Sequence, residues 1–184
     1  MTALLNIISA LLLTVSAQSD STVLLNAHVM KSEDKWRIVN DGVMGGLSSS
    51  TVSVNDEGKI LFGGNVSLKN NGGFASLRSP IKDYKFEKYS GIEISIKGDG
   101  KKYSISMKET SYFIGSFYTV NFQTTKDEWI TLKIPFTSFA LYYFGKEVRS
   151  NPQIPLNKIK EIALLIGEKQ EGTFNAEIDF MKLY

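Results

Sequence analysis

Alternation of apolar and polar residues constrains the fold of this 184-residue chain more than any other feature. Residues 92–97 and 102–108 both alternate, and residues 98–100 between them read Gly-Asp-Gly. Successive side chains of a strand point to opposite faces, so this pattern is typical of strands with one buried face. A glycine-rich turn between two such runs predicts a β-hairpin. The apolar positions of the two runs are Ile92, Ile94, Ile96, Tyr103, Ile105 and Met107.

The same pattern predicts further strands at residues 60–68, 118–122, 130–134 and 174–180. Residues 162–166 are apolar throughout, which favours a central strand covered on both faces over a short buried helix. Turns rich in Gly, Asn and Asp separate these runs at short intervals, and no long helical period is present. We therefore expect an all-β fold, an antiparallel β-sandwich.

One segment interrupts this rhythm. Residues 138–157, which contain Pro152 and Pro155, are predicted to form a long loop that crosses an end or a face of the sheets. The length of the chain is that of one domain, and its 42% hydrophobic and 22% charged residues are ordinary for a folded protein. We expect one domain over residues 18–184.

The first 17 residues are predicted to be a signal peptide. An apolar stretch at residues 10–15 leads to Val15-Ser16-Ala17, a small-residue pattern suited to signal peptidase, although no Lys or Arg precedes it. The alternative is a mature N-terminal strand or helix. The apolar run is shorter than the ~20 residues that span a bilayer. We expect an exported protein, periplasmic or secreted, with no transmembrane segment after cleavage.

Composition narrows the chemistry. The chain has no cysteine, which excludes disulfides, a thiol nucleophile and a thiolate zinc site. Its formal net charge is +2 and its basic residues form no stripe, so nucleic acid is not an expected partner. No phosphate-binding glycine motif is present, and no cofactor is expected. A calcium ion held by loop oxygens stays open, because such sites leave little sequence signal.

Catalytic groups are scarce. His28 is the one histidine of the chain, which argues against a Ser-His-Asp triad, and a lone histidine is more often structural. Paired carboxylates could hydrolyse glycosides, but no spacing singles out a pair, so we expect no enzyme. The carboxylates considered for such a pair are Asp41, Asp99, Glu177 and Asp179.

Aromatic residues gather in two segments outside the cleanest alternation. Exposed rings stack on sugar faces and anchor protein interfaces, whereas the alternative is that these rings fill the core and cover sheet edges. The two groups are Tyr112, Phe113, Phe117 and Tyr118, and Phe139, Tyr142, Tyr143 and Phe144. Tyr142 and Tyr143 are taken as candidate binding residues.

Residues 36–50, Trp-Arg-Ile-Val-Asn-Asp-Gly-Val-Met-Gly-Gly-Leu-Ser-Ser-Ser, are the most unusual segment of the chain. They resemble the signature of the NADH:ubiquinone oxidoreductase complex I intermediate-associated protein 30 (CIA30) family. More of the family pattern follows at residues 62–64, 70–78, 97–100, Tyr103, Trp129, 134–136, 172–174 and 178–179.

This resemblance implies a galactose-binding-like jelly-roll fold, related to carbohydrate-binding modules, and implies no catalytic residues. Mitochondrial members of the family are chaperones in the assembly of respiratory complex I. Residues 1–17 are neither Arg-rich nor amphipathic as a mitochondrial transit peptide would be, so the sequence favours export over a role in the matrix.

The residue types of the signature predict two tightly folded loops, one around Asp41 and one around Asn71. Glycines allow backbone angles closed to other residues, and Asn and Asp side chains bond to nearby amides. We expect the two loops to lie close together, with Asp41 and Arg78 beside them; the alternative is that they only shape strand connections. The candidate binding residues are Asn40, Asp41, Met44, Gly45, Gly46, Asn71, Gly73, Arg78, Tyr142 and Tyr143.

Three functions follow from these features. The leading hypothesis is a non-catalytic binding or assembly-factor domain that acts outside the cytoplasm on a protein partner, such as a membrane or respiratory complex. The alternative is a carbohydrate-binding module whose aromatic rings hold a glycan. A hydrolase with paired carboxylates is the third.

Overall fold

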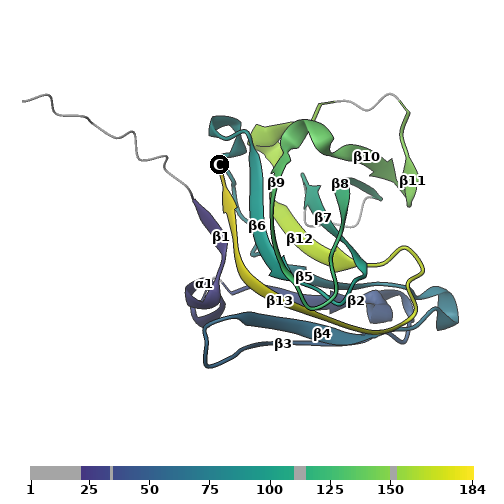
Figure 1. Ribbon diagram of the computed structural model, residues 1–184. Coiled ribbons are helices and arrows are strands. Elements are labelled where there is room, and N and C mark those ends of the chain that lie inside the picture. Colours follow the sequence, from purple (N-terminus) through teal and green to yellow (C-terminus); the bar gives the residue numbers. More distant parts are fainter. Residues whose placement is uncertain (1–21, 34, 110–114, 150–152) are drawn as a thin grey trace, which may run out of the picture.

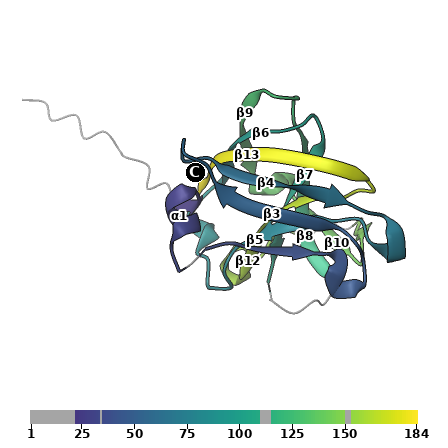
Figure 2. The ribbon, with the colours of Figure 1, turned by 90° about the horizontal axis from the view of Figure 1, so that it is seen from below.

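The structure is a computed structural model that describes residues 22–33, 35–109, 115–149 and 153–184. The predicted signal peptide, residues 1–17, lies outside these residues. Over the described part of the chain, thirteen strands form two antiparallel sheets that enclose one apolar core (Figures 1 and 2). This confirms the predicted all-β antiparallel sandwich.

The first sheet has the strand order β3-β4-β13-β6-β9, and β1 pairs with the end of β13. Its long central strand β13 borders β4 with its first half and β6 with its second. The strands are β1 (Val23–Leu25), β3 (Ser49–Val54), β4 (Ile60–Val66), β6 (Gly91–Lys97), β9 (Trp129–Pro135) and β13 (Gly172–Leu183).

The second sheet has the order β11-β10-β8-β7-β12-β5-β2. Its strands are β2 (Arg37–Asn40), β5 (Ala75–Arg78), β7 (Lys102–Lys108), β8 (Ser116–Gln123), β10 (Ala140–Tyr143), β11 (Lys146–Glu147) and β12 (Glu161–Ile166). The predicted central strand at residues 162–166 is confirmed, because β12 lies between β7 and β5 with both edges paired.

Short helices connect the strands. They are α1 (Ala27–Lys31), η1 (Asp41–Met44), η2 (Lys69–Asn71), η3 (Phe86–Lys88), η4 (Phe136–Ser138) and η5 (Leu156–Lys158). Within the described residues, no helix has the length and apolar character needed to cross a membrane.

Alternation sorts the side chains of both sheets between the core and the surface. Ile92, Ile94 and Ile96 of β6 are fully buried, and so are the aromatic and aliphatic positions of β7 that were predicted to face inward. The rings of Phe62 and Phe174 meet edge to face with their centroids 5.0 Å apart. The core therefore rests on the pattern that defined the predicted strands.

The predicted hairpin of residues 92–108 is wrong, although both of its strands exist. β6 pairs with β13 and β9, whereas β7 pairs with β8 and β12, so the Gly-Asp-Gly turn passes from one sheet to the other. The Asp99 side chain fixes this crossing: it accepts hydrogen bonds from the amide of Asn175 (3.1 Å) and the hydroxyl of Tyr103 (3.2 Å).

The predicted long loop at residues 138–157 is also wrong in part. β10 and β11 form a small hairpin there, and β10 extends the second sheet by pairing with β8. Pro155 begins the turn that leads into η5 and β12. β10 and β11 are short and none of their residues is buried, so the sequence shows little alternation of apolar and polar residues there.

Candidate functional site: a double loop held by Asp41

The carboxylate of Asp41 joins two loops that lie 32 residues apart in the sequence. It accepts hydrogen bonds from the amides of Gly73 (2.6 Å), Phe74 (3.2 Å) and Ser48 (2.9 Å), and from the Ser48 hydroxyl (2.5 Å). The amide of Asp41 in turn donates to the carbonyl of Phe74 (3.3 Å). Residues 41–48 and 67–74, which we call the double loop, are therefore one structural unit.

Ser48 ties the second loop a further time. Its hydroxyl accepts a hydrogen bond from the amide of Ser67 at 2.9 Å, while it donates to Asp41. Both serines are buried, as is Asp41. Figures 1 and 2 show η1 and η2 at the same end of the sandwich, as these bonds require.

Two glycines leave room for the Asp41 side chain. A Cβ atom at Gly46 would overlap the carboxyl carbon and Oδ1 of Asp41, and one at Gly72 would lie 2.7 Å from Oδ2 and from the carbonyl oxygen of Ser67. These positions show why glycine is needed here: the backbone packs directly against the buried carboxylate. Gly45 ends η1, and its amide donates to Gly42.

Asp41 is charged at neutral pH despite its burial. Burial alone would raise its pKa, but hydrogen bonds from the Ser48 hydroxyl and from the amides of Gly73, Ser48 and Phe74 lower the pKa below the ordinary value. Donors to a carboxylate form stronger hydrogen bonds than donors to a neutral oxygen. The charge therefore locks the double loop, and it is not presented to a ligand.

The double loop exposes four apolar side chains, next to the exposed polar residues 69–71. Val43, Met44, Leu47 and Leu68 are 74%, 55%, 56% and 37% exposed. Leu47 precedes Ser48 and Leu68 follows Ser67, so the hydrogen bond between the two serines places these leucines on neighbouring backbone segments. Of the four, Met44 alone is among the candidates from the sequence. The other three could have been recognised as apolar residues inside a Gly- and Asn-rich segment.

The predicted proximity of the two loops is confirmed, but Arg78 does not lie beside them. It stands at the far end of β5, where its guanidinium donates to Glu161 (3.3 Å) and to the Ser76 hydroxyl (3.0 Å). Arg37 donates to the same carboxylate at 2.7 Å. Arg78 belongs to this ion cluster because strand register, which the loop motif does not reveal, carries it away from the double loop.

The remaining candidates near the double loop have different environments. Asn40 accepts a hydrogen bond from the Ser50 hydroxyl at 2.8 Å and so links β2 to β3 across the two sheets. Asn71 is exposed at the end of η2, with a φ of 57°. Gly73 presents its amide to Asp41.

Tyr142 and Tyr143 lie on β10, separated from β5 by three strands, or roughly 20 Å at the usual strand spacing. The Tyr142 ring stacks on Phe117 with centroids 5.8 Å apart, while Tyr143 is 52% exposed and meets Phe144 edge to face. Phe139 and Tyr118 are core residues, and Tyr112 and Phe113 lie outside the described residues. The predicted binding residues therefore fall on separate surfaces.

The four carboxylates considered for glycoside hydrolysis are all held by other groups. Asp41 holds the double loop, and Asp99 holds the turn between the sheets. Burial of the Tyr103 hydroxyl, which donates to Asp99, and the charge of Asp99 both raise the pKa of Tyr103. Glu177 pairs with Lys97, and Asp179 with Lys59, each at 2.6 Å. Within the residues that the structure describes, no three His, Cys, Asp or Glu side chains cluster as metal ligands would.

The antiparallel two-sheet topology defines a β-sandwich domain. The chain belongs to the complex I intermediate-associated protein 30 (CIA30) family, whose sequence pattern matches residues 25–178.

Relatives from animals and yeast support this assignment. Complex I intermediate-associated protein 30, mitochondrial, of Drosophila melanogaster is 27% identical over 172 residues, covering 82% of this chain and 58% of that protein. The Mus musculus protein of the same name is 24% identical, covering 82% and 52%. An uncharacterized protein of Schizosaccharomyces pombe is 32% identical, covering 73% and 69%. The chain thus spans little more than half of the two animal relatives.

Solved structures support the fold. The family 11 carbohydrate-binding module of the cellulase Lic26A-Cel5E of Clostridium thermocellum superposes with a TM-score of 0.64 at 17% identity, covering 89% of this chain and 93% of that module. The agarase AgWH50C gives a TM-score of 0.58 at 8% identity, covering 89% of this chain and 24% of the agarase. At such identities the likeness concerns the fold and not the ligand.

The predicted export is wrong in the light of these relatives, because the animal proteins are named mitochondrial. The prediction of export gave the apolar composition of residues 1–17 more weight than the resemblance of the remaining chain to a mitochondrial family.

Proposed function

We propose that this chain is a non-catalytic binding domain that assists the assembly of respiratory complex I in mitochondria, and that the double loop contacts the protein partner. Membership of the CIA30 family supports this role, as do the names of the animal relatives. The partner, the compartment and the absence of catalysis are all parts of the proposal.

The observation that carries it is the group of exposed apolar side chains on the double loop. Side chains of Val43, Met44, Leu47 and Leu68 face solvent on a backbone that Asp41 holds in one conformation. Clustered exposed apolar residues mark protein interfaces, and a rigid carrier loses little conformational entropy on binding.

The charged groups fit a binding role better than a catalytic one. The Asp41 carboxylate accepts four hydrogen bonds from the chain itself and is buried, so it is poorly placed to take a substrate proton. General acid-base catalysis needs a group within hydrogen-bond reach of the substrate.

The test is a pull-down of tagged protein from detergent-solubilised mitochondria, with complex I subunits quantified by mass spectrometry. The double variant Met44→Ser with Leu47→Ser should lose most of the captured subunits. Phe144→Ser, which changes an equally exposed apolar residue on the hairpin of β10 and β11, is the matched control and should retain them. Equal capture by both variants, or no complex I subunits with the unmodified chain, would refute the proposal.

A second candidate function, glycan binding, draws support from the outer face of the second sheet. There the rings of Phe117 and Tyr142 stack with centroids 5.8 Å apart. Aromatic rings stack on the apolar faces of sugars. Binding on a glycan array that disappears with Tyr142→Ala, and persists in the Met44 and Leu47 double variant, would favour this candidate.

A further inference from the structure

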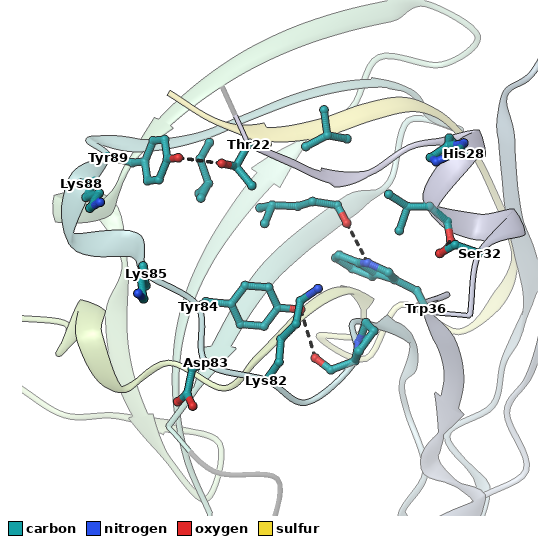
Figure 3. A pocket seen from close by; sticks show the side chains of 15 residues that line it. Thr22, His28, Ser32, Trp36, Lys82, Asp83, Tyr84, Lys85, Lys88 and Tyr89 are labelled. Atoms are coloured by element: carbon teal, nitrogen blue, oxygen red, sulfur yellow. Dashed lines mark hydrogen bonds between the residues drawn. The ribbon is translucent and has the colours of Figure 1, made fainter. Parts of the chain in front are cut away.

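A pocket of about 490 Å³ lies at the other end of the sandwich from the double loop (Figure 3). It is enclosed by β1 and α1 on one side and by residues 80–89 on the other. Figures 1 and 2 place α1 opposite η1 and η2, and the pocket shares no residue with the double loop. Its volume falls within the range of small-molecule sites.

Three apolar side chains form the floor of the pocket. Trp36, Leu24 and Leu183 are buried at 2%, 6% and 3% exposure. The indole nitrogen of Trp36 donates to the carbonyl of Leu24 at 2.9 Å, so the ring presents its apolar surface without an unsatisfied donor. Such a floor favours an aromatic or aliphatic body.

The rim of the pocket is held in place before any ligand binds. The hydroxyl of Tyr84 donates to the carbonyl of Pro80 at 3.0 Å, and Tyr89 and Thr22 share a hydrogen bond of 2.6 Å. The amides of Lys82 and Tyr84 donate to the carbonyls of Lys160 and Ile159. These bonds fix residues 82–84 to the two residues that precede β12. A preformed pocket loses little free energy to ordering.

The charge of the rim is positive. Lys82, Lys85 and Lys88 line it, and Figure 3 shows the Lys82 side chain extending beside the Tyr84 hydroxyl, toward Trp36. The Lys82 ammonium lies 5.6 Å from the centroid of the Tyr84 ring. Asp83, the carboxylate of the lining, is paired with Lys160. Three lysines and one carboxylate thus line the mouth of this pocket, and its charge favours an anion.

We propose that this pocket binds an amphipathic organic anion, with an aromatic or aliphatic body on the Trp36 floor and a carboxylate, phosphate or sulfonate at the lysines. The two halves of the pocket act differently: burial of the body supplies most of the affinity, and the lysines select the anion. This site is independent of the double loop and of the proposed assembly role.

Two fluorescent probes separate these contributions. 8-Anilino-1-naphthalenesulfonate carries a sulfonate, and N-phenyl-1-naphthylamine is the same body without it. We expect the sulfonate probe to bind at least tenfold more tightly, with an affinity that falls as salt rises, because salt screens the lysines. Equal affinity for the two probes would overturn the proposal.

Variants then locate the probe. The triple variant of Lys82, Lys85 and Lys88 to Met should weaken sulfonate binding about tenfold and leave the neutral probe within about twofold. Lys146→Met, an exposed lysine on β11, is the control and should change neither. Undiminished sulfonate binding by the triple variant would contradict the assignment of the lysines.

Filling the pocket gives a further measurement. Val29→Trp places a large ring at the α1 wall and should abolish binding of both probes while the circular dichroism spectrum stays that of the unmodified chain. The Met44 and Leu47 double variant should bind both probes normally. Loss of probe binding in that variant would place the probes on the double loop and would contradict the proposal. If Val29→Trp unfolds the chain, the lysine variants still test the proposal.

Discussion

The amide nitrogen of Gly73 lies 2.6 Å from Oδ2 of Asp41, across 32 residues of sequence. This contact joins the two glycine-rich loops on a single buried carboxylate. Three further hydrogen bonds reach the same carboxylate, two from Ser48 and one from Phe74. The apolar surface proposed to bind a partner therefore depends on a group that no partner would touch.

Replacing Asp41 by Asn should destabilise the chain. The amide group of Asn would turn a donor toward amides that need an acceptor, and a hydrogen bond to a charged group contributes about 1.5–3 kcal/mol. We expect the free energy of unfolding to fall by about 2–3 kcal/mol in urea titrations. Asp56→Asn, at an exposed turn position, should change it by less than about 0.5 kcal/mol. Equal effects of the two substitutions would contradict the role given to Asp41.

The same carboxylate predicts how stability depends on pH. Because the pKa of folded Asp41 is lowered, its contribution is fully present above the unfolded value of about 3.9 and is lost as pH falls through the folded pKa. Thermal melts between pH 6 and pH 2 should show a steeper loss of stability below about pH 4 in the unmodified chain than in Asp41→Asn. Parallel curves would show that Asp41 has an ordinary pKa in the folded state.

Gly46 and Gly42 offer a matched pair of substitutions on the same loop. A Cβ at Gly46 would overlap the Asp41 carboxyl group, whereas a Cβ at Gly42 meets nothing within 4 Å. Gly46→Ala should lower the free energy of unfolding by about 1–3 kcal/mol, the usual range for overpacking. Gly42→Ala should leave it within about 0.5 kcal/mol. Chemical denaturation of the two variants side by side gives the comparison, and an unaffected Gly46→Ala would mean that the loop relaxes freely.

Residue pattern predicted the faces of the strands but not their partners. Ile94 and Ile105 are buried in the core as expected, yet their strands lie in different sheets. A strand shows the same alternation in whichever sheet it pairs, so alternation carries no information on pairing. The crossing depends on Asp99 reaching Asn175, a contact 76 residues apart that short-range patterns do not contain.

Loop chemistry was more informative than strand pattern for the candidate site. Asp and Asn beside glycines predicted that the two loops would be tight and close, because such side chains bond to neighbouring amides. Arg78 was misplaced, since its position depends on the register of β5 against β12. The pocket around Trp36 was not predicted at all: its walls come from both ends of the described chain, Thr22 and Leu183 among them.

The ion cluster of Glu161 with Arg37 and Arg78 predicts a final substitution. Glu161 is 3% exposed and accepts from both guanidinium groups, at 2.7 Å and 3.3 Å. Glu161→Gln would leave two cations beside each other without a counter-charge, but Arg37 is 46% exposed and partly screened by water. We expect a loss of about 2 kcal/mol in the free energy of unfolding, less than the 3–5 kcal/mol of a fully buried pair. The control is Glu168→Gln, whose pair with Lys102 is 42–46% exposed and should contribute less than about 1 kcal/mol. If urea titrations give both variants the stability of the unmodified chain, the cluster does not hold β2, β5 and β12 together, and apolar packing alone must do so.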